Sequence, residues 1–508
     1  MISGVSFHLV CGFEAVMCQV EEDYNGLECK QEKIPVPTLN RKCMKCKEGT
    51  AVLIIRVSDA FCRSCFKEYF IHKFRAMLGK NRVIFPQEKV LLAVSGGAAS
   101  CSMLAQVQEG LSRDAPKKLR FMPGIIYIDD GGACGRSSEE RQRSIDQLKS
   151  IFTETGFPYF IVPLEQVFSL PTSVLVPGTS DPDPSNPSYK QAVDQYIKEN
   201  QKLTEEEAAS AVAQLRIEES VCSPEHKLAL ERLFSSLNTL TAKEDMLQTL
   251  RQHLILHIAR ENGYSKVMMG DSCSRLAVKL LSNIALGRGA ALASDTGFSD
   301  PRYGDVVIVR PMRDYSSKEI AAYSRMFHVP SVFISGLDTK THDKASIQRL
   351  TESFVTNLQA DFPSTVSTIY RTSEKLHTVI PSQGQTTEPA SKCLLCLCAL
   401  DTNVDKASAF HATLVSEQLS QIKLQDTSHD ARHCAEGQGC GTGGCCSSNR
   451  SPEHQDLKTL LCYSCRLTIK DTGAVDALPP YIITEAEKRQ KRSRMKMEIS
   501  EYLLEDGE

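Results

Sequence analysis

The chain has 508 residues, and at about 100 to 200 residues per domain it is long enough for two to four folded units. Its 59 Lys and Arg residues nearly balance its 62 Asp and Glu residues, and the net charge of −3 excludes a histone-like or polybasic protein. Hydrophobic residues make up 41% of the chain and no apolar run approaches the ~20 residues of a membrane helix, so we expect a soluble globular protein.

The N-terminal stretch and the cysteines indicate the compartment. The first residues lack a basic region and run into acidic residues, which is a poor match to a secretory or mitochondrial signal. We therefore expect a cytoplasmic protein without a membrane partner. In this reducing environment the 20 cysteines serve as free thiols, redox groups or metal ligands.

Two Cys-x-x-Cys pairs follow an arm, residues 1–42, that we expect to be loosely ordered. Cys43, Cys46, Cys62 and Cys65 have the spacing C-x2-C-x15-C-x2-C, which presents four thiolates tetrahedrally to one Zn2+. The spacing predicts a structural zinc site in a module over residues 43–87, too small to bury a core of its own. The alternative is four unligated thiols.

Basic and aromatic side chains interleave in the helical segment after these cysteines. Its cations are Lys67, His72, Lys73, Arg75, Lys80 and Arg82, and its aromatic residues are Phe66, Tyr69, Phe70 and Phe74. The cations predict contacts to RNA phosphates, while the rings either seat the helix on the structure beneath or stack on bases. An amphipathic linker helix is the other interpretation.

Residues 88–376 alternate short aliphatic runs with helical patterns, which predicts βαβ units and a parallel sheet. The predicted strands are Lys89 to Val94, Gly124 to Asp129, Tyr159 to Val162, Lys266 to Met269 and Val306 to Val309. Residues 171–240 begin with a loop rich in Pro, Ser and Asp and continue with a Glu-rich stretch, so we interpret them as a surface insertion.

A glycine loop follows the first predicted strand. Ser95, Gly96, Gly97 and Ser100 stand where a strand passes into a helix, and there unpaired backbone N–H groups and the helix dipole can cradle an anion. A Gly pair between a strand and a helix is also a common tight connection, so the loop alone does not predict a phosphate site.

Two later helices are predicted from their patterns. Thr241 and Glu244 form a capping box for a helix that Gly263 stops. Ile347, Leu350, Phe354 and Leu358 mark the apolar face of a helix that closes the domain.

A second cysteine module is predicted over residues 377–484, with a disordered insertion at 401–460. Cys393, Cys396, Cys462 and Cys465 are the proposed ligands of a second structural Zn2+. The competing thiols are Cys398, Cys434, Cys440, Cys445 and Cys446, which we interpret as loop cysteines. Residues 485–508 are expected to form a basic helix, because six of the nine residues from Lys488 to Lys496 are basic. That helix either reaches RNA, docks on a partner, acts as a nuclear localisation signal or is a solvated helix.

The glycine loop and the motifs around it carry a family resemblance. In order, FCRSCF, HKFRAMLGKNR, SGGAAS, GDSCSRLA, VRPMRD and CLLC resemble the tRNA thiolase branch of the PP-loop ATP pyrophosphatases, from Met17 to Glu508. The resemblance implies an α/β fold with a PP-loop (adenine nucleotide alpha hydrolase-like) parallel-sheet domain, flanked by N- and C-terminal zinc-ribbon-like modules.

Departures from the pattern of the catalytic relatives imply that this chain has lost their catalytic activity. The acidic residue of the SGGxDS loop is replaced by Ala99, which offers no oxygen to Mg2+, so the pattern argues against magnesium-dependent adenylation and leaves nucleotide binding by the loop open. Catalytic relatives carry a Cys-x-x-Cys where this chain has Thr241 to Glu244, and a GHNxDD motif where it has Gly270 to Arg275. Cys222 and Cys273 are interpreted as incidental thiols.

The resemblance implies a non-catalytic, tRNA-binding subunit for the 2-thiolation of wobble 5-methoxycarbonylmethyl-uridine in lysine, glutamine and glutamate tRNAs. The implied partners are a catalytic paralogue, tRNA thiolation protein 1, and a ubiquitin-like sulfur carrier protein that is thiocarboxylated. Lys73, Arg75, Lys80 and Arg82 are the candidate tRNA contacts. Two alternatives stay open: a self-sufficient adenylating enzyme that uses Asp271 or Asp130, and a zinc-dependent nucleic acid adaptor outside thiolation.

Overall fold

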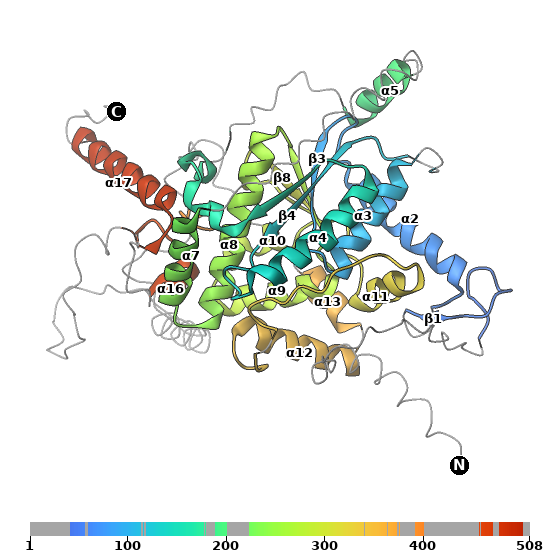
Figure 1. Cartoon of the computed structure of the whole chain (residues 1–508). Helices are drawn as coiled ribbons and strands as arrows, with labels where there is room; N and C mark the ends of the chain where they lie inside the picture. Colours follow the sequence, from blue (N-terminus) through green and yellow to red (C-terminus); the bar gives the residue numbers. More distant parts are fainter. Residues whose placement is uncertain are drawn as a thin grey trace, which may run out of the picture.

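The computed structural model describes residues 41–55, 59–112, 115, 118–176, 178, 188–200, 223–339, 341–362, 364–372, 375, 392–400, 457, 459–470 and 477–500. Its centre is a six-stranded sheet in the order β5-β4-β3-β6-β8-β7 (Figure 1). The strands are β3 (Lys89–Ala93), β4 (Met122–Asp129), β5 (Tyr159–Pro163), β6 (Lys266–Met269), β7 (Ser299–Asp300) and β8 (Val307–Val309). All neighbouring pairs are parallel except β7 and β8.

The strand order reverses direction at β3. The chain runs from β3 outward through β4 and β5, and then returns to β6 on the other side of β3. Ligands of open α/β sheets bind at such a reversal, outside the carboxyl ends of the strands. The loops that follow β3, β4 and β6 therefore form the candidate site.

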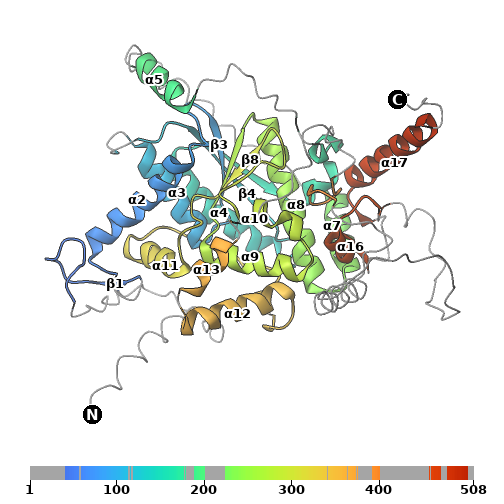
Figure 2. The ribbon, with the colours of Figure 1, turned by 180° about the vertical axis from the view of Figure 1, so that it is seen from behind.

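Helices cover both faces of this sheet, as Figures 1 and 2 show. The α-helices are α2 (Arg63–Asn81), α3 (Ala98–Leu111), α4 (Ser138–Thr155), α5 (Tyr189–Asn200), α7 (Pro224–Ser236), α8 (Leu240–Glu261), α9 (Cys273–Ala285), α10 (Leu292–Thr296), α11 (Ser317–Met326), α12 (Ile347–Asp361), α13 (Thr365–Thr372), α16 (Tyr463–Lys470) and α17 (Pro480–Ser500). Short 3-10 turns are η1 (Leu164–Ser169), η2 (Thr172–Leu175) and η3 (Gly289–Ala291), and a small hairpin joins β1 (Leu53–Ile54) to β2 (Ala60–Phe61). No described helix is both long and apolar enough to cross a membrane.

The sheet divides the core into two layers, because side chains alternate between its faces. Val90 and Leu92 of β3 join the layer built with α2, α3, α4 and α11, whereas Leu91 joins the layer built with α7, α8, α16 and α17. We call these the α2 layer and the α8 layer. The first cysteine group belongs to the α2 layer and the second to the α8 layer.

The five predicted strands are present, each within two residues of its expected bounds. Sequence reasoning missed β7, an antiparallel edge strand of two residues, which is too short to show alternation. The helix that Gly263 ends is also confirmed, with Gly263 at a φ of 70°.

The capping box predicted for α8 is wrong. The helix begins two residues earlier than that box requires, and Thr239 caps it by accepting from the Ala242 N–H. Thr241 instead accepts from the Ile347 N–H at the start of α12, 3.1 Å away. This tertiary contact takes the hydroxyl that the local pattern had assigned to the cap.

The apolar face predicted for α12 is also only partly buried. Leu350 and Phe354 are 52% and 55% exposed, whereas Val355 packs against α9 and α13 with Val366 and Tyr370. Val355 therefore marks the buried side of α12, and the Thr241 contact joins the start of this helix to α8.

Parts of the predicted insertion and of the C-terminal module belong to the α8 layer. Within 171–240, η2 and α7 contribute the buried residues Val174, Leu175, Leu230, Leu233 and Phe234. Residues 179–187 and 201–222 lie outside the described residues, as do 1–40, 376–391, 401–456 and 501–508. The basic helix predicted over 485–508 begins earlier, with α17 at Pro480.

Candidate functional site

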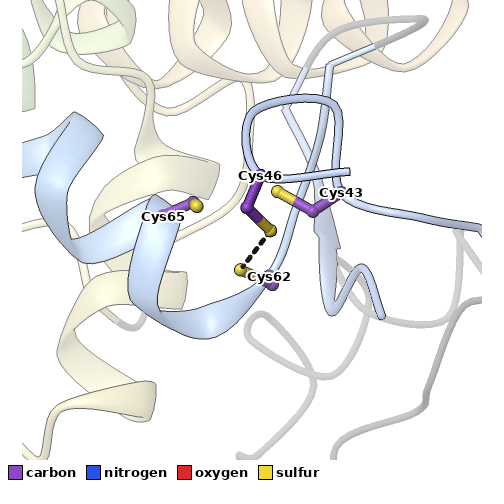
Figure 3. A group of neighbouring side chains, drawn as sticks. All are labelled: Cys43, Cys46, Cys62 and Cys65. Atoms are coloured by element: carbon purple, nitrogen blue, oxygen red, sulfur yellow. Dashed lines mark hydrogen bonds between the residues drawn. The ribbon is translucent and has the colours of Figure 1, made fainter. Parts of the chain in front are cut away.

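The first cysteine group gathers four thiols between a turn and a helix start (Figure 3). Cys43 and Cys46 flank a tight turn, Cys62 precedes α2, and Cys65 lies in its first turn. The four sulfur atoms lie within 4.8 Å of one another, and those of Cys46 and Cys62 are 3.8 Å apart. Four thiolates on one zinc at ~2.3 Å would be about 3.8 Å apart, so the group fits a single tetrahedral ion.

The four thiols of this group can all ionise together only when a cation neutralises their negative charge. Burial opposes ionisation of Cys43, but backbone N–H groups of Cys46 and Cys62 outweigh it and lower its pKa to about 6. Burial and the neighbouring thiols raise the pKa of Cys65 to about 12. Without a cation the thiols cannot all ionise together near neutral pH, and a metal ion would remove this barrier.

The second cysteine group is built in the same way. Cys393 and Cys396 form a knuckle, Cys462 precedes α16, and Cys465 lies in its first turn. These sulfur atoms also lie within 4.8 Å of one another, with Cys396 and Cys462 3.6 Å apart. The structure therefore brings together both predicted sets of four.

The competing thiol Cys398 lies outside this set. Its sulfur accepts from Arg302 Nη1 at 2.8 Å, and Arg302 in turn pairs with Asp295 and Asp300. Cys434, Cys440, Cys445 and Cys446 lie outside the described residues.

The glycine loop joins β3 to α3 and is held by its own groups. Ser100 Oγ accepts from the Ser95 N–H at 3.2 Å and donates to the Gly97 carbonyl at 3.1 Å. Gly96 has a φ of 87°, which favours glycine, and its carbonyl accepts from the Val332 N–H at 2.9 Å. The Ser100 hydroxyl, which the pattern offered to a phosphate, is thus engaged within the loop.

Two carboxylates lie at the end of β4, the strand beside β3, and are paired with arginines. Asp130 pairs with Arg136 at 2.8 Å and also with Arg251 of α8. Asp129 pairs with Arg136 at 3.3 Å and with Arg141 at 2.7 Å. Both carboxylates are buried. Sequence reasoning singled out Asp130 as an alternative catalytic carboxylate but did not anticipate that arginines pair with it and with Asp129.

Gly270 follows β6 and lies against the start of α3. A Cβ atom at this position would lie 2.8 Å from Ser100 Cα, so only glycine lets the end of β6 approach the start of α3. The next residue, Asp271, lies 3.4 Å from Arg310 Nε.

The basic helix predicted after the first cysteines is α2, and its rings seat it on the α/β domain. Phe66, Phe70 and Phe74 are fully buried, and Phe70 stacks on Tyr323 of α11 with ring centroids 3.9 Å apart. These rings are therefore not available to bases.

The side chains of the four candidate tRNA contacts lie in different environments. Lys73 pairs with the buried Glu319 at 2.7 Å and lies over the Tyr315 ring, so it holds α2 to α11 and does not face solvent. Arg75 is half-buried, whereas Lys80 and Arg82 are exposed at the far end of the helix.

Comparisons with known proteins identify the family. A model described as cytoplasmic tRNA 2-thiolation protein 2 matches residues 346–467. Proteins of that name from Danio rerio and Homo sapiens are 83% and 50% identical, with 97% of this chain covered in both cases and 100% and 99% of theirs. The chain belongs to the cytoplasmic tRNA 2-thiolation protein 2 family.

A solved structure is also similar in outline. The U34-tRNA thiolase NcsA from Methanococcus maripaludis, described with its 4Fe-4S cluster, aligns with a TM-score of 0.45 and 16% identity, over 72% of this chain and 98% of that chain. The matched segment of the cytoplasmic tRNA 2-thiolation protein 2 family model, residues 346–467, contains all four thiols of the second cysteine group.

At its other end, the segment matched by the cytoplasmic tRNA 2-thiolation protein 2 model begins where α12 meets α8. Glu244 of α8 lies at this contact, where the Ser346 hydroxyl and the Arg349 charge favour its ionised form. Burial, helped by the charges of Asp338 and Glu352, raises its pKa to about 7. An isolated glutamate loses its proton near pH 4.3.

We expect Glu244→Gln to stabilise the protein at pH 8 by about 1 to 2 kcal/mol, after allowance for solvent screening. The folded state binds more protons than the unfolded state between about pH 4.5 and 7. Stability therefore falls as pH rises through that window, and glutamine mimics the neutral acid. Urea unfolding at pH 5 and pH 8 measures the effect. The exposed Glu231→Gln is the control, and an equal pH dependence in wild type and Glu244→Gln would contradict the assignment.

Proposed function

We propose that this chain is the non-catalytic, tRNA-binding subunit of a cytosolic tRNA thiolation complex. Relatives at 50 to 83% identity over nearly their whole length carry the name cytoplasmic tRNA 2-thiolation protein 2. The reaction is 2-thiolation of 5-methoxycarbonylmethyl-uridine at the wobble position of lysine, glutamine and glutamate tRNAs. The catalytic partner is tRNA thiolation protein 1, and a thiocarboxylated ubiquitin-like protein supplies the sulfur.

The pairing of Asp129 and Asp130 carries the non-catalytic part of this proposal. Adenylation of a uridine needs carboxylates that help to hold Mg2+ beside the triphosphate. Ala99 supplies none, and the arginines Arg136, Arg141 and Arg251 already neutralise both carboxylates at the end of β4. A magnesium ion would have to displace buried guanidinium groups, which is costly.

The cysteine groups support structural zinc and not an iron–sulfur cluster. In a four-iron cluster each cysteine binds a different iron, which holds the sulfur atoms farther apart than in a mononuclear site. Here each set of four sulfur atoms lies within 4.8 Å, as one tetrahedral ion requires. No open coordination position remains for a substrate. Zinc would therefore supply rigidity and no step of the reaction.

We assign the contacts between α2 and tRNA phosphates to the exposed end of this helix. Lys80 and Arg82 are exposed there, and Arg75 contributes from its half-buried position. Lys73 is not among the proposed tRNA contacts, because Glu319 neutralises its charge.

ATP-dependent release of AMP on unmodified lysine tRNA tests the proposal. The chain alone, the catalytic paralogue alone, and the two together with the sulfur carrier are compared. We expect release by the pair and none by this chain alone.

Two results would replace the proposal. Release by this chain alone, lost in Asp130→Asn or Asp271→Asn, would make it an adenylating enzyme. Binding of tRNA without stable pairing to the paralogue would make it a nucleic acid adaptor outside thiolation.

A further inference from the structure

Helix α17 has a buried base. Tyr481, Ile482 and Ala486 pack in the α8 layer, and Arg489 is buried with Glu485, its Nε 2.9 Å from Glu485 Oε1. Arg489 also donates to the carbonyls of Lys392 and Leu175, at 2.8 and 3.2 Å. This half of the helix is therefore fixed to the body.

The remainder of α17 projects from the molecule, as Figures 1 and 2 both show. Every residue from 491 to 496 is exposed. At 100° per residue, Lys488, Lys491, Arg492 and Lys496 lie on one face of the helix, around Met495 and Ile499. The carboxylates Glu487 and Glu498 fall at one edge of this basic face.

The base of α17 is tied to the second cysteine group through two polar links. Arg489 Nη1 holds the carbonyl of Lys392, the residue before Cys393. His253 of α8 bridges the Leu395 carbonyl, inside the knuckle, at 2.8 Å and the Tyr481 hydroxyl at 2.6 Å. Burial lowers the pKa of His253 to about 4, so the ring is neutral. Its Nε2–H must donate to the carbonyl, and its Nδ1 accepts from the Tyr481 hydroxyl.

We propose that the second cysteine group and α17 form one unit, in which the metal-bound knuckle fixes the direction of a basic arm that binds the phosphate backbone of a structured RNA. The identification of that RNA as tRNA rests on the proposed function. The rigid base matters because an isolated helix of about ten residues is marginal in water, so the exposed half depends on its anchored half.

The charge and apolar content of the arm favour RNA over a membrane. A helix that lies on a lipid surface needs a broad apolar face, whereas the exposed face of the arm carries two large apolar side chains, Met495 and Ile499, among four cations. Cations on a projecting helix face match a phosphate backbone, where each contact releases bound counterions.

The test measures binding of the full chain to a tRNA transcript at several salt concentrations. The triple variant Lys491→Gln, Arg492→Gln, Lys496→Gln is compared with a control of equal charge change, Lys118→Gln, Lys227→Gln, Lys344→Gln, whose residues are exposed elsewhere. We expect the arm variant to lower the slope of log K against log salt by about 2 and the affinity roughly tenfold or more, with the control unchanged. An unchanged slope in the arm variant would overturn the RNA assignment. The RNA assignment would also be overturned if the arm variant lost binding to phosphatidylserine vesicles and kept its binding to RNA.

The link between α17 and the second cysteine group is tested separately, by amide hydrogen exchange along α17. Cys393→Ser with Cys396→Ser is expected to speed exchange over 480–496 relative to β3 and β4, and to weaken RNA binding. Tyr481→Phe, which keeps all the thiols, is expected to do the same to a smaller degree, so general misfolding of the cysteine variant does not decide the result. Protected α17 amides in Tyr481→Phe and in a chelated wild type would refute the link.

These outcomes are independent of the thiolation proposal. Binding is measured with purified chain and RNA, whereas thiolation is measured as the 2-thiouridine content of cellular tRNA. If the arm variant binds tRNA normally while deletion of the chain abolishes thiolation, the arm proposal fails alone. If the arm binds tRNA but deletion leaves 2-thiouridine unchanged, the proposed function fails alone.

Discussion

Replacing Cys62 with serine is expected to lower the metal content from two ions to one per chain and to destabilise the protein by more than about 3 kcal/mol. The serine hydroxyl does not replace the thiolate, and structural zinc sites contribute on the order of 10 kcal/mol to the folding of small modules. Part of this is retained here, because the rings of Phe66 and Phe70 anchor α2 independently. Elemental analysis and thermal unfolding measure the two effects.

Cys134→Ser is the matched control for this experiment. Cys134 is half-buried and lies outside both groups of four, so the variant should keep two ions. A wild-type protein with less than one ion per chain would remove the metal assignment altogether, and a Cys62→Ser protein with two ions would remove it for the first group.

Arg141→Met is expected to cost about 3 to 5 kcal/mol of unfolding free energy. Arg141 donates to both oxygens of the fully buried Glu165, at 2.7 and 3.1 Å, and to Asp129 Oδ2 at 2.7 Å. Its loss leaves Glu165 as a buried carboxylate without a counter-charge and Asp129 with Arg136 alone. Urea unfolding gives the free energy directly.

Two further variants separate charge from packing at this site. Arg143→Met makes the same chemical change on the exposed side of α4 and should cost little. Arg141→Met with Glu165→Met should recover most of the loss, because an apolar pair of similar volume needs no counter-charge. If the double variant were less stable than Arg141→Met, the cost would not come from the orphaned carboxylate.

The sequence predicts best the features that depend on neighbouring residues. The buried strands appear as short aliphatic runs, and Gly263 ends α8 because the left-handed conformation there favours glycine. Paired Cys-x-x-Cys motifs predict which thiols meet, since each pair forms one knuckle and only the two knuckles remain to be joined.

Features fixed by distant partners were not predictable in this way. Lys73 and Glu319 are separated by 246 residues, and nothing local distinguishes Lys73 from the exposed Lys80. The exposure of Leu350 on α12 depends on which side of the helix packs on α9 and α13, and the helical pattern is the same whichever side is covered. Charge patterning in one chain does not show which cations are already neutralised inside the fold.

The two-layer core has a consequence for biosynthesis. Leu247, Leu250 and Leu254 of α8 belong to the same buried cluster as Leu394 and Ile482, which are translated more than a hundred residues later. The nascent chain therefore exposes these apolar side chains of α8 until its final segment leaves the ribosome. During that interval it is a substrate for chaperones. A premature stop before the second cysteine knuckle would remove one side of the core, and not a dispensable tail.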